Sequence, residues 1–251
     1  MRVAALYDIH GMLVPLEAVL AELAHEEVDA IVIGGDAVSG PQPAEVLALL
    51  RSLDRPVHWI RGNGERALGP DASDAVMAGA EGEAALRFTA AQFSDAERKE
   101  LANLPEQVTL EVDGLGSTLF CHASPRNDLD IVTGGTPVER FSLLLEGVSE
   151  PVVVAGHTHM QLDLTVDGMR WINPGSVGMP FEGDVAAFWA LLGPDLELRR
   201  TPFDVEQSAS ALLESGWPEA EPFVEENLRA APSRDETIAL FEQIARERGE
   251  R

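Results

Sequence analysis

Side chains that could bind metal ions recur directly after short apolar segments of this sequence. The motif DIH follows VAALY, GGD follows AIVI, and GN follows PVHWIR. A lone histidine follows STLFC, and HTH follows PVVVAG. The ligand-type residues in these motifs are Asp8, His10, Asp36, Asn63, His122, His157 and His159.

The mixture of imidazole, carboxylate and amide groups indicates which metals would bind. It suits manganese, iron, zinc or nickel better than calcium or magnesium. Seven such side chains are too many for one tetrahedral zinc, so two ions that share a carboxylate are the natural arrangement. Two ions about 3.5–4 Å apart lower the pKa of a water held between them, which gives hydroxide near neutral pH. We therefore expect two divalent transition-metal ions, manganese first and iron, nickel or zinc as alternatives, and attack on a phosphorus centre.

Each motif has a structural alternative when taken alone. An aspartate or asparagine after a strand is commonly a turn residue, and Gly-Asn is a common left-handed turn. The His-Thr-His motif is more specific, because packing does not explain two imidazoles in one loop. The conjunction of all five motifs, each after an apolar segment, favours a shared site over five separate turns.

The elements that position these motifs follow from hydrophobic periodicity. The segments VAALY (3–7), AIVIGGD (30–36) and PVHWIRGNGE (56–65) are each predicted to be a strand that runs into a loop, and PLEAVLAELAHEEV and AEVLALLRSL between them have helical spacing. Strands that alternate with helices imply parallel pairing in a covered sheet, with the ligands at the carboxyl ends of the strands. The second half predicts three hairpins, in 108–121, 162–176 and 186–203, and is therefore richer in antiparallel strands.

The pattern of predicted strands and helices divides the chain into a main domain and an extension. We expect one domain over residues 1–203, with a helical insertion at about 66–104, and a helical C-terminal extension over 204–251. The extension is too apolar to be a plain linker. We expect it to dock on the main domain or on a second subunit through Phe223, Leu228, Phe241 and Ile244, with no part in bond cleavage.

Composition excludes several classes of protein. The chain has 43 acidic and 18 basic residues and a formal charge of −25, so extended nucleic acid and anionic membranes are unfavourable partners. Bound cations would reverse that field locally for a small phosphate compound. The single cysteine allows neither an intrachain disulfide nor a cysteine-based zinc cluster. We find no signal-like or membrane-spanning apolar segment in the sequence and therefore expect a cytoplasmic protein. Assembly into a homo-oligomer is an open possibility.

Together, DIHG, GGDA, GNGE, CHAS and GHTH resemble the motif series of the calcineurin-like metallophosphoesterase superfamily over roughly residues 1–200. The sequence is similar to the small bacterial phosphodiesterase branch, for which NPGS after the strand RWI is also typical. The resemblance implies an α/β fold, a four-layer αββα sandwich of two mixed β-sheets flanked by helices. Our own interpretation of parallel strands followed by hairpins is compatible with it.

The resemblance also implies roles for individual residues. One metal ion would be held by Asp8, His10, Asp36 and His159, and the other by Asp36, Asn63, His122 and His157, with Asp36 as the bridge. It implies hydrolysis of small phosphodiesters or phosphomonoesters by in-line attack of a metal-bridging hydroxide, with Asp36, Asn63 and His122 as the catalytic set. Arg126 is a candidate phosphate contact.

Two other functions stay open at this point. A nucleotide-anhydride hydrolase of the diadenosine polyphosphate type, or a protein phosphatase, shares the metal chemistry but usually relies on a histidine after Gly-Asn. A non-catalytic metal-binding scaffold typically has eroded ligands, whereas all seven match here.

The sequence departs from the family pattern at Gly64, where many members have that histidine. Glycine cannot transfer a proton, so poor leaving groups should suffer most. Candidates to compensate are Glu65, Arg61 and Arg66 beside the loop, and Arg126 and Asn127 after His122.

Overall fold

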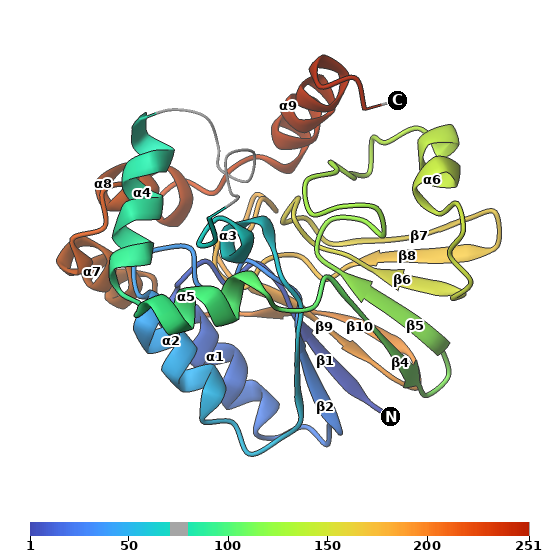
Figure 1. The fold of residues 1–251 in the computed structure, drawn as a ribbon, viewed down its shortest axis with the longest axis horizontal. Helices are drawn as coiled ribbons and strands as arrows, with labels where there is room; N and C mark the ends of the chain where they lie inside the picture. Colours follow the sequence, from blue (N-terminus) through green and yellow to red (C-terminus); the bar gives the residue numbers. More distant parts are fainter. Residues whose placement is uncertain (71–79, 251) are drawn as a thin grey trace.

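Two five-stranded sheets form the centre of the protein in a computed structural model that describes residues 1–70 and 80–250. The first sheet has the order β10-β9-β1-β2-β3 and the second the order β4-β5-β6-β8-β7. Figure 1 shows the sheets side by side, with helices on their outer faces. Among the described residues, no helix is both long enough and apolar enough to cross a membrane.

The first sheet combines parallel and antiparallel pairs. Its parallel core is β1 (Val3–Leu6), β2 (Ala30–Ile33) and β3 (Val57–Trp59), connected through helices α1 (Leu13–Leu23) and α2 (Pro43–Arg51). The hairpin of β9 (Ala187–Leu192) and β10 (Leu196–Thr201) adds antiparallel to β1. All residues of β1, β2 and β9 are buried, as expected for strands covered on both faces.

The second sheet is built from two of the predicted hairpins around one parallel strand. The hairpins are β4 (Gln107–Val112) with β5 (Gly116–Cys121), and β7 (Leu162–Val166) with β8 (Met169–Asn173). Between them β6 (Val152–Val154) pairs parallel with β5 and β8. Helix α6 (Val138–Leu144) covers the outer face of this sheet.

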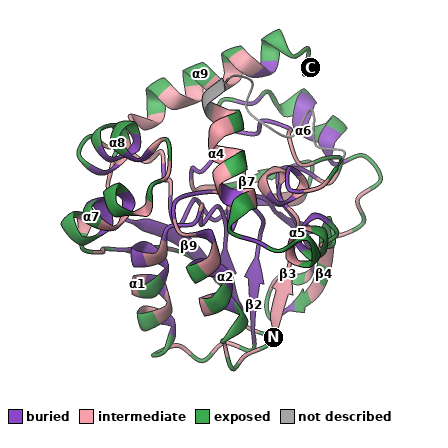
Figure 2. Ribbon diagram, turned by 60° about the vertical axis from the view of Figure 1, so that its left-hand side comes forward, coloured by how far each residue is buried: buried purple, intermediate pink, exposed green. Residues whose placement is uncertain are grey.

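Three apolar clusters define four layers. Residues of α1 and α2 pack on the outer face of the first sheet, and residues of α6 pack on the outer face of the second. Between the sheets lies a third cluster of Val3, Ala5, Tyr7 and Val32 from one side and Phe120, Val154 and Ile172 from the other. Figure 2 shows the buried strands β2 and β9 behind α1 and α2, whose outer faces are exposed. The predicted αββα sandwich is therefore confirmed.

Additional helices follow β3 and β10. The first group is α3 (Asn63–Arg66), α4 (Ala80–Ala91) and α5 (Asp95–Ala102), of which α4 and α5 lie within the stretch 66–104 predicted as a helical insertion. The second is α7 (Val205–Ser215), α8 (Ala220–Phe223), the π-helical turn η1 (Val224–Leu228) and α9 (Arg234–Glu247). Residues 71–79 of the predicted insertion lie outside the described residues, and the division at residue 203 stays a prediction.

The C-terminal helices contact the main domain in two places. Phe223 and Leu228 are buried in a cluster with Met12, which precedes α1. Phe241 and Ile244 on α9 are only half-buried, and the Phe241 ring packs edge-on against Phe181 at 5.9 Å. Helix α9 is therefore held mainly by polar contacts, such as the Glu242 carboxylate accepting from Thr133 and Thr136 at 2.6 and 2.8 Å.

Candidate metal centre

The predicted ligands lie in loops at the carboxyl ends of five strands. Asp8 and His10 follow β1, Asp36 follows β2, and Asn63 begins α3 after β3. His122 directly follows β5, and the two histidines of the HTH motif follow β6. Because β1, β2 and β3 run parallel in one sheet and β5 and β6 in the other, all these loops meet at one edge of the sandwich.

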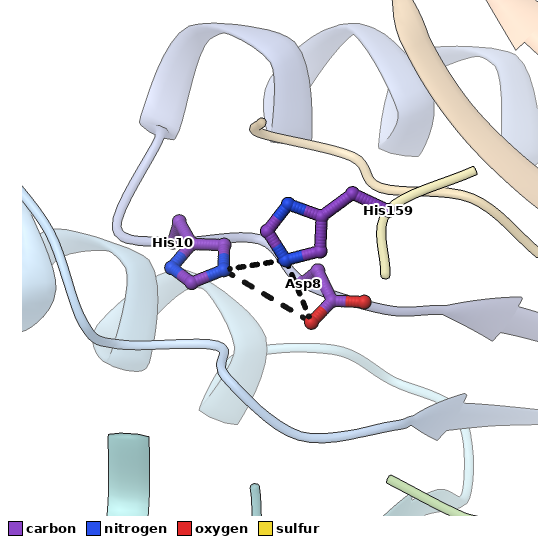
Figure 3. Close-up of side chains that lie close together, drawn as sticks. All are labelled: Asp8, His10 and His159. Atoms are coloured by element: carbon purple, nitrogen blue, oxygen red, sulfur yellow. Dashed lines mark hydrogen bonds and ion pairs between the residues drawn. The ribbon is translucent and has the colours of Figure 1, made fainter. Parts of the chain in front are cut away.

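The tightest group of ligand atoms consists of Asp8, His10 and His159 (Figure 3). The two Nε2 atoms of the histidines are 3.1 Å apart. Asp8 Oδ1 lies 3.3 Å from His159 Nε2 and 4.0 Å from His10 Nε2. Asp8 is fully buried, and its Oδ1 has no hydrogen-bond partner among the described residues.

A second group lies beside the first and shares Asp8 with it. It adds Asp36 and His122, with Asp36 Oδ1 3.7 Å from His122 Nε2. Asn63 Oδ1 is 3.2 Å from the same nitrogen. Burial opposes protonation of His122, but the carboxylates of Asp36 and Asp8 and the hydrogen bond to Gly34 O together outweigh it and raise the pKa of His122. His157 is outside both tight groups, although its ring packs against that of His122 at 5.2 Å.

Asp36, a member of the second group, lies between His10 of the first group and His122. Its Oδ2 is 4.0 Å from His10 Nε2, whereas its Oδ1 is turned toward His122 and accepts the backbone N–H of Gly64 at 2.6 Å. One carboxylate oxygen therefore faces each of these two histidines.

Backbone hydrogen bonds orient the imidazoles. The Nδ1 atoms of three ligand histidines face carbonyl oxygens: His10 faces Ser39 at 3.2 Å, His122 faces Gly34 at 2.9 Å and His159 faces Met179 at 2.8 Å. A carbonyl only accepts, so Nδ1 carries the proton and a neutral ring leaves Nε2 bare. The Nε2 atoms are the ones that converge.

This donor set fits a bound cation. Two bare imidazole nitrogens 3.1 Å apart repel each other and the nearby Asp8 carboxylate unless a positive charge lies among them. The unpartnered buried Oδ1 of Asp8 points to the same conclusion, since leaving such an oxygen without a partner costs about 1–3 kcal/mol or more.

Electrostatics favour the metal-binding forms of Asp8, His10 and His157. Burial tends to raise the pKa of Asp8, but His159, His122 and His10 together overcome this and lower it well below its usual range. Burial, together with His159, lowers the pKa of His10. Burial and the adjacent His122 lower the pKa of His157 well below the ordinary value. A charged carboxylate and neutral imidazoles are the ligand forms that a divalent ion needs.

The ligand loops hold an uncommon backbone conformation. In the described residues, six non-glycine residues have positive φ, and five of them are predicted ligands, with φ between 49° and 66°. These five are Asp8, His10, Asp36, His157 and His159, and the sixth, Asp167, lies in the β7–β8 turn. Such left-handed residues cost of order 1–3 kcal/mol each and concentrate at functional sites. Neighbouring loops hold them, for example through His10 N–H donating to Asp36 O at 2.9 Å.

Glu65 was a candidate to compensate for the histidine missing at position 64, but its contacts indicate a structural role. Its carboxylate is 1% exposed and accepts backbone N–H groups of Asp36, Ala37, Val38 and Gly62 at 2.8–3.2 Å. It therefore ties the loop after β2 to the loop after β3. Burial raises the pKa of Glu65, and the charge of Asp36 adds to the rise. Both oxygens are occupied by backbone donors, so Glu65 is poorly placed to donate a proton to a leaving group.

We expect Glu65→Gln to destabilise the protein because one of its two oxygens becomes an NH₂ group that faces backbone donors. Leaving buried donors unsatisfied costs about 1–3 kcal/mol. The free energy of unfolding in urea, measured without metal, should fall by that amount. Glu106→Gln is the matched control, since that carboxylate is 72% exposed and pairs with Arg61 at the surface. Equal stability of the two variants would contradict this role.

Neighbouring atoms crowd the position that a side chain on residue 64 would take, although the φ angle of Gly64 is not left-handed. A Cβ atom at this position would lie 1.9 Å from Ser39 Oγ and 2.9 Å from Asp36 Oδ1. The hydroxyl of Ser39 thus occupies the space in which a residue-64 side chain would begin. This relation joins two loops, and no sequence pattern indicated it.

The arginine candidates lie in a cavity of about 690 Å³ that reaches His122. Arg66 pairs with Asp128 at 2.6 Å and Arg61 pairs with Glu106, so both carry carboxylate partners. Arg126 lines the same cavity and is exposed. Arg248, from beyond α9, also contributes to the lining, which brings the C-terminal extension to the edge of the site.

Phe181 is a site residue that the sequence did not indicate. Its ring stacks on His159 at 5.0 Å with an interplanar angle of 19°, and Phe241 of α9 packs behind it. Nothing in the segment around Phe181 marks it as a support for a ligand, because the contact depends on a loop that returns from β8.

Family comparison agrees with this geometry. Residues 1–192 match the model of the calcineurin-like phosphoesterase superfamily domain. The chain belongs to this superfamily, and it carries candidate ligand groups for the divalent metals that the family binds.

The alignments with individual relatives cover most of this chain. An uncharacterized protein of Methanocaldococcus jannaschii is 24% identical over 86% of this chain and 94% of its own length. The crystal structure of a metallophosphoesterase from Sphaerobacter thermophilus has a TM-score of 0.70 and 28% identity, and the match covers 92% of this chain and 99% of that one. A hypothetical protein of Pyrococcus horikoshii has the same fold, with a TM-score of 0.77 and 22% identity over 89% of this chain and 97% of that one.

Proposed function

We propose that this protein is a dinuclear metal-dependent phosphoesterase that hydrolyses small phosphodiesters or phosphomonoesters. The observation that carries the proposal is the convergence of imidazole nitrogens and carboxylate oxygens on the buried, unpartnered Oδ1 of Asp8. Family membership supports the same reaction class. Manganese is the first choice of metal on the chemistry of the donors, with iron, nickel or zinc as alternatives.

The ligands fall into two proposed sets. One ion is held by Asp8, His10, Asp36 and His159, and the other by Asp36, Asn63, His122 and His157. When bound, the two ions activate water and neutralise charge on the phosphoryl oxygens. The position of the Asp36 carboxylate between His10 and His122 supports its role as the bridge.

The chain's own groups contribute orientation. The hydrogen bonds from Nδ1 to carbonyl oxygens hold the rings of His10, His122 and His159 in place before substrate binds. Arg126, at the edge of the cavity that includes His122, is the proposed contact for a substrate phosphate oxygen. The left-handed loop residues fix the ligand directions and so reduce reorganisation during the reaction.

A second candidate activity is hydrolysis of a nucleotide anhydride. It is favoured by one likeness, to a symmetrical bis(5'-nucleosyl)-tetraphosphatase of Pectobacterium carotovorum, which is 30% identical over 148 residues. That match covers 58% of this chain and 51% of the enzyme.

Metal analysis combined with a substrate panel tests both candidates. The purified protein is loaded with manganese, and bound metal is counted by mass spectrometry before and after chelation. Hydrolysis is then measured for an aryl diester, an aryl monoester, a cyclic nucleotide and a dinucleoside polyphosphate. We expect about two ions per chain and ester hydrolysis that chelator abolishes and manganese restores. Fastest turnover of the polyphosphate would favour the second candidate, and hydrolysis of none of the compounds would contradict both.

A further inference from the structure

A second, smaller cavity of about 220 Å³ borders the candidate metal centre. Its lining includes His10, Asp36 and Asn63, so a group bound there lies against the reacting end of a substrate. Cavities that enclose a whole small ligand have volumes of about 300–1,000 Å³. This cavity therefore fits one part of a substrate rather than all of it.

The walls of the small cavity come from helices on both sides. Leu86 belongs to α4, and Met179 follows β8. Trp217 and Phe223 belong to the C-terminal extension, and their rings pack edge to face at 5.6 Å. This contact holds the indole in place, and the wall it forms is apolar and aromatic.

Charge excludes an anionic occupant. No lysine or arginine occurs among the described residues that line the small cavity, and Glu219 adds a carboxylate to it. The larger cavity also reaches the centre through His122, and its lining combines Arg61, Arg66, Arg126 and Arg248 with Glu106, Asp128, Asp130 and Glu250. Cationic groups that could contact an anionic part of a substrate therefore occur only in the larger of these two cavities, among the described residues, and the smaller one suits a neutral part.

We propose that this cavity is a subsite for a neutral aromatic ring on the substrate's ester group. The inference rests on the proposed function and adds the substrate class: phosphoesters of ring-bearing alcohols, such as phenols or nucleosides. The ring packs between Leu86 and the Trp217–Phe223 pair.

Binding of phosphonates tests the subsite without turnover. Methylphosphonate and phenylphosphonate have no ester bond to break, so leaving-group ability does not influence the result. Their affinities for the manganese-loaded protein are measured by calorimetry. We expect phenylphosphonate to bind about tenfold more tightly than methylphosphonate, because it buries a ring.

Variants of the cavity wall test the packing of the ring. In Trp217→Ala and in Leu86→Ala the preference for phenyl over methyl should fall, whereas methylphosphonate affinity stays the same. Trp217→Phe keeps an aromatic ring, so the phenyl preference should remain. Leu213→Ala is the matched control, since this α7 side chain is 47% exposed and does not line the cavity.

The outcomes distinguish this inference from the proposed function. Equal affinities for methyl- and phenylphosphonate, or binding of neither, would overturn the subsite. A phenyl preference that is unchanged in both Trp217→Ala and Leu86→Ala would also overturn it. A ring preference without hydrolysis of any ester would leave the subsite in place and refute only the phosphoesterase.

Discussion

Asp36→Asn should lower turnover of an aryl phosphate ester by at least about 10³-fold and reduce the bound metal from about two ions per chain to about one. A bound ion supplies several kcal/mol of charge stabilisation in the transition state, and each 1.36 kcal/mol is about a factor of ten in rate. The carboxylate turns one oxygen toward His10 and the other toward His122, so the neutral amide weakens both proposed sets at once. Turnover and metal content are measured on the same preparation.

Asp167→Asn is the matched control for this substitution. Asp167 is also an aspartate with positive φ, at 52°, but it lies in the β7–β8 turn and its carboxylate accepts from Ser142 at the surface. Asparagine tolerates the left-handed conformation, so neither variant should unfold for backbone reasons. If the Asp36→Asn protein keeps two ions and full activity, a shared carboxylate is not part of the centre.

Rates should also depend steeply on the leaving group, with aryl phosphate esters turned over about 10²–10⁴-fold faster than alkyl esters. A positioned general acid contributes that factor, and the centre has no side chain at Gly64 to supply it. Glu65 does not replace it, because its oxygens accept four backbone N–H groups. The measurement is kcat for a series of esters with leaving groups of increasing pKa. A flat dependence would mean that another group already donates the proton.

A histidine introduced at position 64 should narrow this gap, provided it fits. Its Cβ would fall 1.9 Å from Ser39 Oγ, so the single variant Gly64→His must displace that hydroxyl. The double variant Ser39→Ala/Gly64→His removes the obstructing atom. We expect it to raise the alkyl rate selectively relative to Ser39→Ala alone, which serves as its control.

Much of the fold could be predicted because local patterns determine it. Buried strands such as β1 and β6 are continuous apolar segments, and the turns Asp113-Gly114 and Asp167-Gly168 mark two hairpins. The convergence of the ligand motifs follows from the rule that parallel strands end at the same edge. The seven candidate ligands could therefore be identified from the sequence, whereas the conformations of the loops that carry them could not.

The surroundings of the centre could not be predicted because they depend on contacts between distant segments. Trp217 reaches the small cavity only because α7 and α8 pack near Met12, and Phe181 reaches His159 through a returning loop. The C-terminal extension was expected to be a docked support without a role in bond cleavage. Its residues line both cavities at the centre, which neither periodicity nor composition indicates.

The left-handed backbone conformation of the five candidate ligands has a consequence for protein engineering. Glycine adopts such a conformation without the steric cost borne by aspartate and histidine, so it is the residue that relaxes each of these loops. A directed-evolution screen for thermostability, run on metal-free protein, would therefore enrich glycine at these positions and discard the ligands. A library intended to keep activity should hold these positions constant and be selected with the metal present.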